Sequence, residues 1–202
     1  MPYYKNINTL FIHIPKTGGS SLENYLQNKS PQTLFSGPVN DIMPHEHLKK
    51  ISLQHQTLHH IWKYKKILNV NFNNLTILTI VRNPYDRIIS DLFHFNLINI
   101  NTPPNKVCEI IKKYIKRTDL DNHNIPQYKF ICDANGNINT YIKKIKMFKT
   151  ETLTKELHTY GFTDYKRPDK VNNYMQYLNK DSIKVINKFY HIDFLIFDYT
   201  MV

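Results

Sequence analysis

Two short apolar runs, each followed at once by turn-forming residues, are the clearest hydrophobic pattern in the chain. Residues 8–14 (NTLFIHI) and 75–81 (LTILTIV) lack the strict alternation of a half-exposed strand and are typical of strands buried on both faces. Pro-Lys-Thr-Gly-Gly follows the first run and Arg-Asn-Pro the second, and both sequences end a strand. Helical patterns follow over 20–28 and 85–97. This repeated strand–loop–helix order predicts an α/β fold with a parallel sheet and helices on both faces.

The remaining residues divide into helical, extended and irregular segments by the same criteria. They predict helices over 57–68, 106–116, 152–160 and 182–190, short strands over 51–54 and 141–148, a turn at 133–139, a loop at 169–173, and an apolar segment at 193–197. Residues 30–47 contain three prolines and are expected to be irregular. No repeat, low-complexity linker or compositional change divides the chain, so residues 1–202 are predicted to form one domain.

The composition is that of a globular protein with an unusual positive charge. Hydrophobic residues make up 41% of the 202 positions and aromatic residues 13%, which is enough for a full core. The formal net charge of +11 favours anionic partners such as nucleotides, nucleic acid, acidic glycans or membrane surfaces. The competing interpretation is a solvated surface enriched in lysine by the base composition of the genome. The two cysteines, Cys108 and Cys132, form no CxxC or zinc-like pattern, so a reducing compartment is the default.

The N-terminal sequence does not resemble a secretory signal, because His13 and Pro15 interrupt its apolar run. No stretch of about 18 apolar residues predicts a transmembrane helix. We therefore expect a soluble protein, cytoplasmic by default. Nothing in the sequence indicates an oligomeric state.

The first candidate site is the segment HIPKTGGSS, residues 13–21, between the first predicted strand and its helix. Such a loop presents backbone N–H groups to an anion, and the start of the helix adds partial positive charge. Lys16 supplies a mobile cation, the glycines permit close approach, and three hydroxyl groups are available from Thr17, Ser20 and Ser21. The lysine precedes the glycines, unlike the Walker A order, so an ordinary ATP or GTP site fits poorly. The alternative is a tight turn with a surface lysine.

The second candidate site begins at Arg82, where the stronger apolar run ends. Open α/β sheets bind ligands at this edge, and a guanidinium group can contact a phosphate through two hydrogen bonds. Ser90, about two helical turns later, offers a hydroxyl group. Asp86 suits the first turn of a helix, and Arg87 is expected to pair with it or to face solvent. We assign no catalytic role to Asp86 or Arg87.

Together, FIHIPKTGGSSL and IVRNPYDRIIS closely resemble the phosphate-binding signatures of the sulfotransferase superfamily, which uses 3′-phosphoadenosine 5′-phosphosulfate (PAPS). The resemblance is greatest to the branch of heparan sulfate 2-O- and 6-O-sulfotransferases and related carbohydrate sulfotransferases. It implies a P-loop-like three-layer fold with a central, mainly parallel sheet flanked by helices. It also implies transfer of a sulfuryl group from PAPS to a hydroxyl acceptor, expected to be a glycan, with 3′-phosphoadenosine 5′-phosphate (PAP) as the product.

The resemblance also implies roles for individual residues. It assigns the 5′-phosphosulfate to Lys16, Thr17, Gly18, Gly19, Ser20 and Ser21, the 3′-phosphate to Arg82 and Ser90, and a late loop near the nucleotide to Asn172. Ser20 replaces a threonine that is common in the family, which keeps a hydroxyl group. In the segment MFKTETL a familiar acidic residue is replaced, so this stretch gives no site assignment, and the sequence predicts no membrane anchor like that of the Golgi enzymes.

Two catalytic roles follow from the chemistry of sulfuryl transfer, in which positioning and charge stabilisation dominate. Lys16 is expected to neutralise charge on the leaving oxygen. A histidine suits removal of the acceptor proton, and His55 is preferred because related enzymes carry their catalytic histidine at a similar place. His59, His47, His60 and, more weakly, Glu46 are the alternatives. No metal is expected, although HxH at 45–47 and HH at 59–60 hint at zinc.

Two other functions remain open from the sequence. A nucleotide or small-molecule kinase would need a Walker-like lysine and an acidic magnesium ligand, and neither is evident. A noncatalytic basic module that binds nucleic acid or glycan would explain the charge but not two phosphate motifs, so no nucleic-acid partner is expected. Acceptor choice is expected to lie in residues 30–47 and 96–124. Basic residues of the second segment that could attract an acidic glycan, or simply face solvent, are Lys106, Lys112, Lys113, Lys116 and Arg117.

Overall fold

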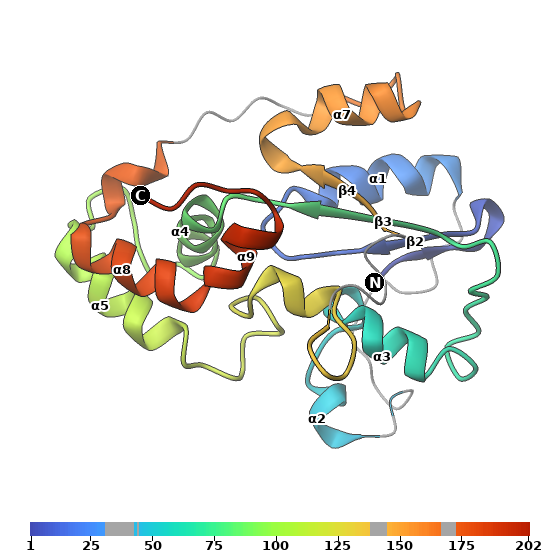
Figure 1. The fold of residues 1–202 in the computed structure, drawn as a ribbon, viewed down its shortest axis with the longest axis horizontal. Coiled ribbons are helices and arrows are strands. Elements are labelled where there is room, and N and C mark those ends of the chain that lie inside the picture. The colour runs from blue at the N-terminus through green and yellow to red at the C-terminus, as the bar shows by residue number, and fades with distance from the viewer. Residues whose placement is uncertain (31–42, 44, 138–144, 167–172) are drawn as a thin grey trace.

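The computed structural model describes residues 1–30, 43, 45–137, 145–166 and 173–202. A four-stranded sheet forms its centre, in the order β1 (Tyr3–Tyr4), β2 (Thr9–Ile12), β3 (Thr76–Val81) and β4 (Ile145–Lys149). The β2, β3 and β4 strands run parallel, and only the short β1 is antiparallel to its neighbour. The carboxyl ends of β2 and β3 therefore meet at one edge, where each strand leads into a loop and a helix (Figure 1).

Helices cover both faces of this sheet (Figure 1). The α-helices are α1 (Gly19–Lys29), α2 (Glu46–Lys49), α3 (Leu58–Lys63), α4 (Pro84–His94), α5 (Pro104–Tyr114), α7 (Leu153–Tyr160), α8 (Lys180–Phe189) and α9 (His191–Ile196). Short 3-10 turns are η1 (Lys5–Ile7), η2 (Leu53–His55), η3 (Gln127–Phe130), η4 (Thr150–Thr152) and η5 (Tyr174–Tyr177). The α1 and α7 helices lie on one side of the sheet and α3 on the other. The expected α/β architecture with a mainly parallel, helix-flanked sheet is confirmed.

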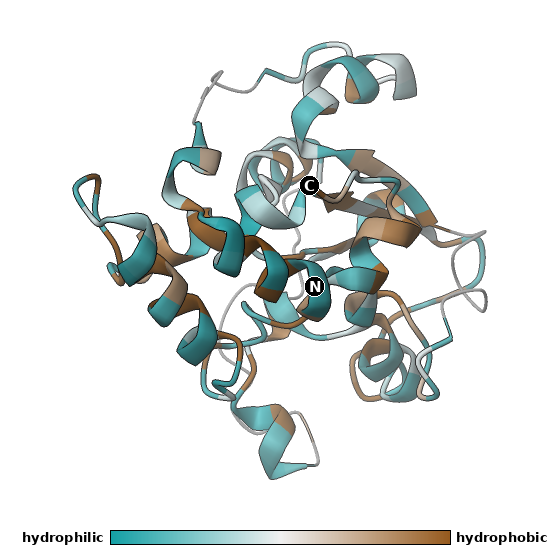
Figure 2. Ribbon diagram, turned by 60° about the vertical axis from the view of Figure 1, so that its left-hand side comes forward, coloured by the Kyte–Doolittle hydropathy of each residue, from teal (hydrophilic) through white to brown (hydrophobic). Residues whose placement is uncertain are grey.

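The strand residues are divided between two cores. Phe11, Leu78 and Ile80 pack with apolar residues of α1 and α7, whereas Leu10 and Ile77 pack with those of α3 and η3. Both faces of β2 and β3 are buried, which is why their sequences lack alternation. A third cluster joins α4, α5, α8 and α9 beside the sheet. In Figure 2 the strands are largely hydrophobic, whereas the helices alternate hydrophilic and hydrophobic residues.

Several predicted boundaries change in the structure. The strand expected over 51–54 is wrong: Leu53–His55 forms the 3-10 turn η2, and the buried Leu53 anchors it in the core without strand pairing. The helix expected over 57–68 is shorter, since α3 ends at Lys63. The described part of the expected strand 141–148 forms β4. Residues 31–42, 44, 138–144 and 167–172, which include much of two predicted loops, lie outside the described residues. Among the described helices, none combines the length and apolar character needed to cross a membrane.

Candidate active site

A cavity of about 470 Å³ opens at the carboxyl edge of β2 and β3, where ligands bind in open α/β sheets. Its lining residues come from segments that are far apart in the chain: His13, Pro15, Lys16, Gly18, Gly19, Ser20, Gln54, His55, Arg82, Ser90, His94, His123 and Tyr174. None of these described lining residues is acidic, and two carry permanent positive charge. The cavity is therefore suited to an anionic ligand.

The loop between β2 and α1 has the backbone of an anion-binding turn. Lys16 and Gly18 both adopt left-handed conformations, with φ of 66° and 90°, and turns of this kind direct N–H groups to one side. Gly18 caps α1 without any side-chain hydrogen bond, and the first turn of α1 contains no acidic residue. The positive end of α1 is thus not neutralised by a carboxylate of its own first turn, which suits it to an anionic ligand.

The structure separates the predicted residues of this loop into two groups. Lys16, Gly18, Gly19 and Ser20 line the cavity, whereas Ser21 is absent from its described lining. Thr17 is fully buried, and its hydroxyl group donates to the carbonyl oxygen of Ile14 at 2.8 Å, so this side chain closes the turn. Asn172 lies outside the described residues.

Arg82 connects the second predicted segment to the first. Its Nη1 atom donates to the carbonyl oxygen of Lys16 at 3.0 Å, and its guanidinium carbon lies 5.2 Å from the centre of the Tyr174 ring. The buried side-chain amide of Gln127 accepts from the Arg82 N–H group at 2.9 Å and donates to its carbonyl oxygen at 2.8 Å. The N–H and carbonyl groups of Arg82 are therefore both fixed by Gln127 at the point where β3 ends.

The α4 helix presents Ser90 and His94 to the cavity, four residues apart on one face. The N-terminus of α4 is not exposed to the ligand in the manner of α1, because the side chain of Asn83 accepts from the N–H group of Tyr85. Asp86 also lies in this first turn, and burial raises the pKa of its carboxyl group. The second segment therefore contributes only side chains to the cavity, whereas the first contributes the N-terminus of a helix as well as side chains.

Arg87 corrects the expectation that it pairs with Asp86 or faces solvent. Its side chain is buried and donates to three carbonyl oxygens: that of Pro15 at 3.0 Å, of Ile125 at 2.9 Å and of His123 at 2.6 Å. These contacts join α4 to the β2–α1 loop and to the loop that carries His123. Arg87 therefore has a structural role beside the cavity, because its guanidinium group is hydrogen-bonded to three backbone carbonyl oxygens.

We expect Arg87→Lys to destabilise the protein by about 2–4 kcal/mol, because one ammonium group cannot reach three separate carbonyl oxygens. Denaturant unfolding followed by circular dichroism would measure the change. Arg117→Lys is the matched control, because Arg117 is exposed and pairs with the exposed Asp119, and we expect its unfolding curve to overlay that of wild type. Equal stability changes in the two variants would contradict the role of Arg87.

Four histidines form a row along the cavity. Ring centres are separated by 5.3 Å between His13 and His55, 4.9 Å between His55 and His123, and 5.4 Å between His123 and His94. Of the four, only His55 was predicted. His13 lies inside the first motif and His94 lies one turn after Ser90, so local spacing could have indicated both; no sequence pattern marks His123.

Three of these rings are each oriented by a different carboxylate, which contacts the Nδ1 atom of the ring. His55 Nδ1 lies 2.7 Å from Asp121, His123 Nδ1 lies 2.8 Å from Asp91, and His13 Nδ1 lies 2.6 Å from Glu23. A neutral imidazole that donates from Nδ1 exposes an accepting Nε2 atom.

His55 has the electrostatics of a base. Burial lowers its pKa below the ordinary value, although the hydrogen bond to Asp121 acts in the opposite direction. The ring is therefore neutral at pH 7 and able to accept a proton. Burial raises the pKa of Asp121, but the bonds from His55 and Ser52 outweigh this effect and hold it below the ordinary range. Asn122 also donates to the His55 carbonyl oxygen at 3.0 Å, which fixes the residue from a second side.

The other predicted bases lie away from this cavity. His47, His59, His60 and Glu46 are absent from its described lining. Glu46 is exposed and pairs with Lys49, while burial and neighbouring histidines lower the pKa of His60 to about 4. Geometry therefore favours His55 among the residues considered from the sequence.

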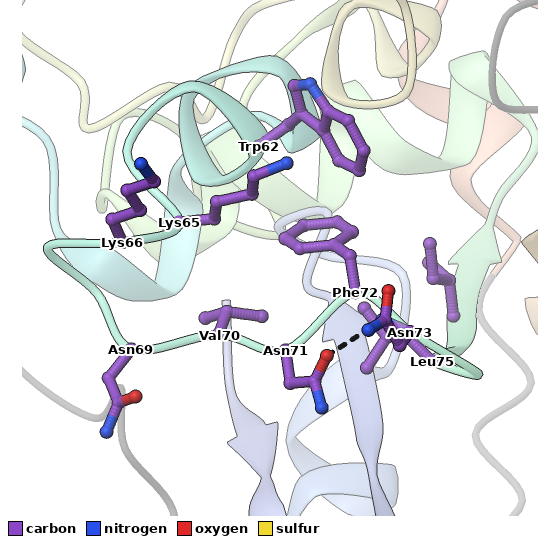
Figure 3. A pocket seen from close by; sticks show the side chains of 10 residues that line it. Trp62, Lys65, Lys66, Asn69, Val70, Asn71, Phe72, Asn73 and Leu75 are labelled. Atoms are coloured by element: carbon purple, nitrogen blue, oxygen red, sulfur yellow. Dashed lines mark hydrogen bonds between the residues drawn. The ribbon is translucent and has the colours of Figure 1, made fainter.

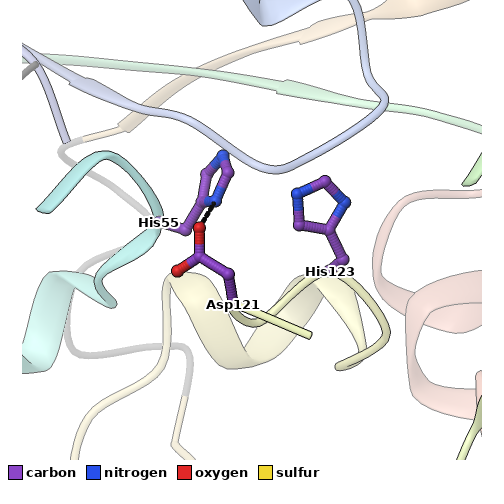
Figure 4. A group of neighbouring side chains, drawn as sticks. All are labelled: His55, Asp121 and His123. Carbon is purple, nitrogen blue, oxygen red and sulfur yellow. Dashed lines mark hydrogen bonds and ion pairs between the residues drawn. The ribbon is translucent and has the colours of Figure 1, made fainter. Parts of the chain in front are cut away.

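The same region contains the one group among the described residues with metal-like spacing. The nearest ligand atoms of His55, Asp121 and His123 all lie within 4.8 Å of one another (Figure 4). This group differs from the HxH and HH patterns at 45–47 and 59–60. The hydrogen bond between His55 and Asp121 already joins two of its members, and a metal would have to replace it. The expectation that no metal takes part stays a prediction.

Gly19 is required by the close packing of His13. A Cβ atom at Gly19 would lie 2.6 Å from Nε2 of His13, whose ring is held by Glu23. We expect Gly19→Ala to destabilise the protein by about 1–3 kcal/mol, measured by denaturant unfolding. The matched control is the double variant that also carries His13→Ala, which removes the ring that clashes with the new Cβ atom. We expect the double variant to be destabilised by about 1 kcal/mol less than the sum of the two single variants. Strict additivity would contradict this account.

Comparison with known families gives one match. A family model described as "Sulfotransferase family" matches residues 4–200, nearly the whole chain and all of the segments that line the cavity. A search of curated proteins and a search of solved structures found no match.

Proposed function

The chain belongs to the sulfotransferase family and is a sulfuryl-transferring enzyme, and from that premise we propose that it uses PAPS as donor and a carbohydrate hydroxyl group as acceptor. The observation that carries the proposal is the meeting of the two segments that are predicted to bind phosphate. Arg82, at the end of β3, donates to the backbone of Lys16 in the loop after β2, so both segments face one cavity.

The lining residues fit a doubly anionic nucleotide. Lys16, Ser20 and the uncapped start of α1 lie together and suit the 5′-phosphosulfate. Arg82 and Ser90 suit the 3′-phosphate, and no acidic side chain of the described lining would repel either end. A volume of about 470 Å³ is within the range of small-molecule sites. Contributions from the backbone of Thr17, from Ser21 and from Asn172 stay predictions.

The proposed mechanism divides the chemistry between two sides of the cavity. When bound, PAPS supplies an activated sulfuryl group for in-line displacement. The Nε2 atom of His55 takes the proton of the acceptor hydroxyl group, and Asp121 stabilises the imidazolium that results. Lys16 neutralises the charge that develops on the departing phosphate oxygen. Positioning and electrostatics therefore supply the catalysis, as in phosphoryl transfer.

Calorimetric titration with PAP tests the donor assignment. We expect saturable binding to the wild-type chain and an affinity at least about tenfold weaker in Arg82→Ala, because a charge-assisted phosphate contact is lost. Arg117→Ala removes the same charge from an exposed position and should bind PAP within about twofold of wild type. Absence of PAP binding, or equal losses in the two variants, would contradict the proposal.

A transfer assay with labelled PAPS then identifies the acceptor class. Glycans, phenols and tyrosyl peptides should be compared at equal concentration, and we expect label to appear on a glycan. Transfer confined to phenols or peptides would overturn the carbohydrate assignment while leaving the donor assignment intact.

A kinase is less well supported. Magnesium held by a carboxylate is a regular part of phosphoryl-transfer sites, and the described lining of this cavity offers no carboxylate.

A further inference from the structure

A second cavity, of about 670 Å³, lies at the opposite end of β3 from the reaction cavity. It is lined by the end of α3, the loop that follows it and the start of β3: Trp62, Lys65, Lys66, Asn69, Val70, Asn71, Phe72, Asn73, Leu75 and Ile77. The β3 strand separates its rim from Arg82 by roughly 20 Å at about 3.3 Å per residue. None of the described residues lines both cavities, so the second is treated as a separate site.

Aromatic and cationic groups converge in this cavity. The rings of Trp62 and Phe72 meet edge to face with centres 4.7 Å apart, and the ammonium group of Lys65 lies 3.7 Å from the centre of the Trp62 ring. Figure 3 shows these three side chains pointing toward one another. Lys66 adds a second cation, and none of the described lining residues is acidic. An anion entering the cavity would meet positive charge beside apolar ring surface.

Asparagine amides form the other wall. Asn69, Asn71 and Asn73 line the cavity, and Oδ1 of Asn71 accepts from the N–H group of Asn73 at 2.9 Å (Figure 3). Asn8 donates to the carbonyl oxygens of Asn73 and Asn74 at 3.0 and 3.1 Å, which ties this loop to the start of β2. The wall is therefore held in place by the sheet and has amide groups that can both donate and accept hydrogen bonds.

We propose that this second cavity binds an acidic oligosaccharide, away from the reaction cavity. Amide side chains match sugar hydroxyl groups, since both kinds of group donate and accept. The ammonium groups of Lys65 and Lys66 match carboxylate or sulfate groups. Single-stranded nucleic acid fits less well, because its bases need an open aromatic face and Lys65 covers that of Trp62. This proposal does not depend on the transfer reaction.

Trp62 provides a direct readout because it is the single tryptophan of the chain, and its side chain is partly exposed. We expect a sulfated octasaccharide from heparin to change the intensity and wavelength of tryptophan emission saturably. A neutral maltoheptaose and a dT8 oligonucleotide should produce changes only at concentrations at least tenfold higher. No change with the octasaccharide, or equal potency of dT8, would overturn the proposal. Saturating PAP should leave the octasaccharide affinity within twofold, and a larger effect would contradict the separation of the two cavities.

Charge-matched variants locate the binding. Removing two lysines from the cavity (Lys65→Ala with Lys66→Ala) should weaken octasaccharide binding at least tenfold by calorimetry. The control removes two lysines from α5 (Lys112→Ala with Lys113→Ala), where the sequence alone also suggested glycan attraction, and should change it less than twofold. Circular dichroism verifies that both variants are folded. Equal losses would indicate attraction by net charge, and a larger loss in the control would place the binding on α5; either result overturns the proposal.

Discussion

Replacing Lys16 with alanine should lower kcat by about 10²- to 10³-fold while the protein stays folded. The loss follows from the proposed role, since removing one preorganised group that stabilises developing charge typically costs this much. The fold should survive because the contact from Arg82 is made to the carbonyl oxygen of Lys16, which alanine keeps. Lys16 has a left-handed φ of 66°, and the energetic cost of this conformation is about the same for alanine as for lysine. Steady-state assay with labelled PAPS would give kcat, and thermal unfolding would verify the fold.

Two controls separate this role from general positive charge. Lys112→Ala removes a lysine from α5, outside the described lining of the cavity, and should keep kcat within about twofold. Lys16→Arg keeps the charge and should recover part of the loss. A kcat for Lys16→Ala within about threefold of wild type, equivalent to about 0.7 kcal/mol, would show that Lys16 does not stabilise the leaving group.

Replacing His55 with alanine should lower kcat by about 10²- to 10⁴-fold, because a positioned general base contributes this much. His47→Ala and His59→Ala are the matched controls, since neither residue is part of the described cavity lining, and both should stay within about twofold of wild type. The three variants should be compared in one steady-state assay at pH 7.5. An active His55→Ala variant would eliminate His55 as the base.

The pH profile tests the electrostatic part of this role. A base must be neutral, so kcat/KM should fall as pH drops through the pKa of His55, which burial places below its usual value of about 6.5. Asp121 acts in the opposite direction and raises this pKa through its hydrogen bond. Asp121→Asn should therefore move the acidic limb to lower pH and also lower the plateau. A lower plateau with an unmoved limb would indicate that Asp121 has only a structural role.

Local sequence determined the parts of the protein in which neighbouring residues decide the outcome. The apolar runs at 8–14 and 75–81 became β2 and β3, because a strand buried on both faces needs apolar residues without alternation. The β3 strand ends where its run ends, directly before Arg82, whereas β2 ends at Ile12, with two residues between it and Pro15. Since parallel strands end at a common edge, Lys16 and Arg82 had to emerge near one another. The first motif and the position of Arg82 therefore follow from local sequence and from the geometry of parallel strands.

Only the tertiary structure decided which polar side chains meet across the cavity. Asp121 and His123 come from a loop without periodicity, and they reach His55 because that loop folds back onto η2. The sequence around Arg87 does not distinguish it from a surface arginine. In the fold it is buried, and it donates hydrogen bonds to three carbonyl oxygens that are distant in the sequence. Spacing along the chain constrains neighbours within a strand or helix turn. Contacts between polar groups 60 or more residues apart, such as His55 with Asp121, depend on how whole elements pack, and no local pattern encodes that arrangement.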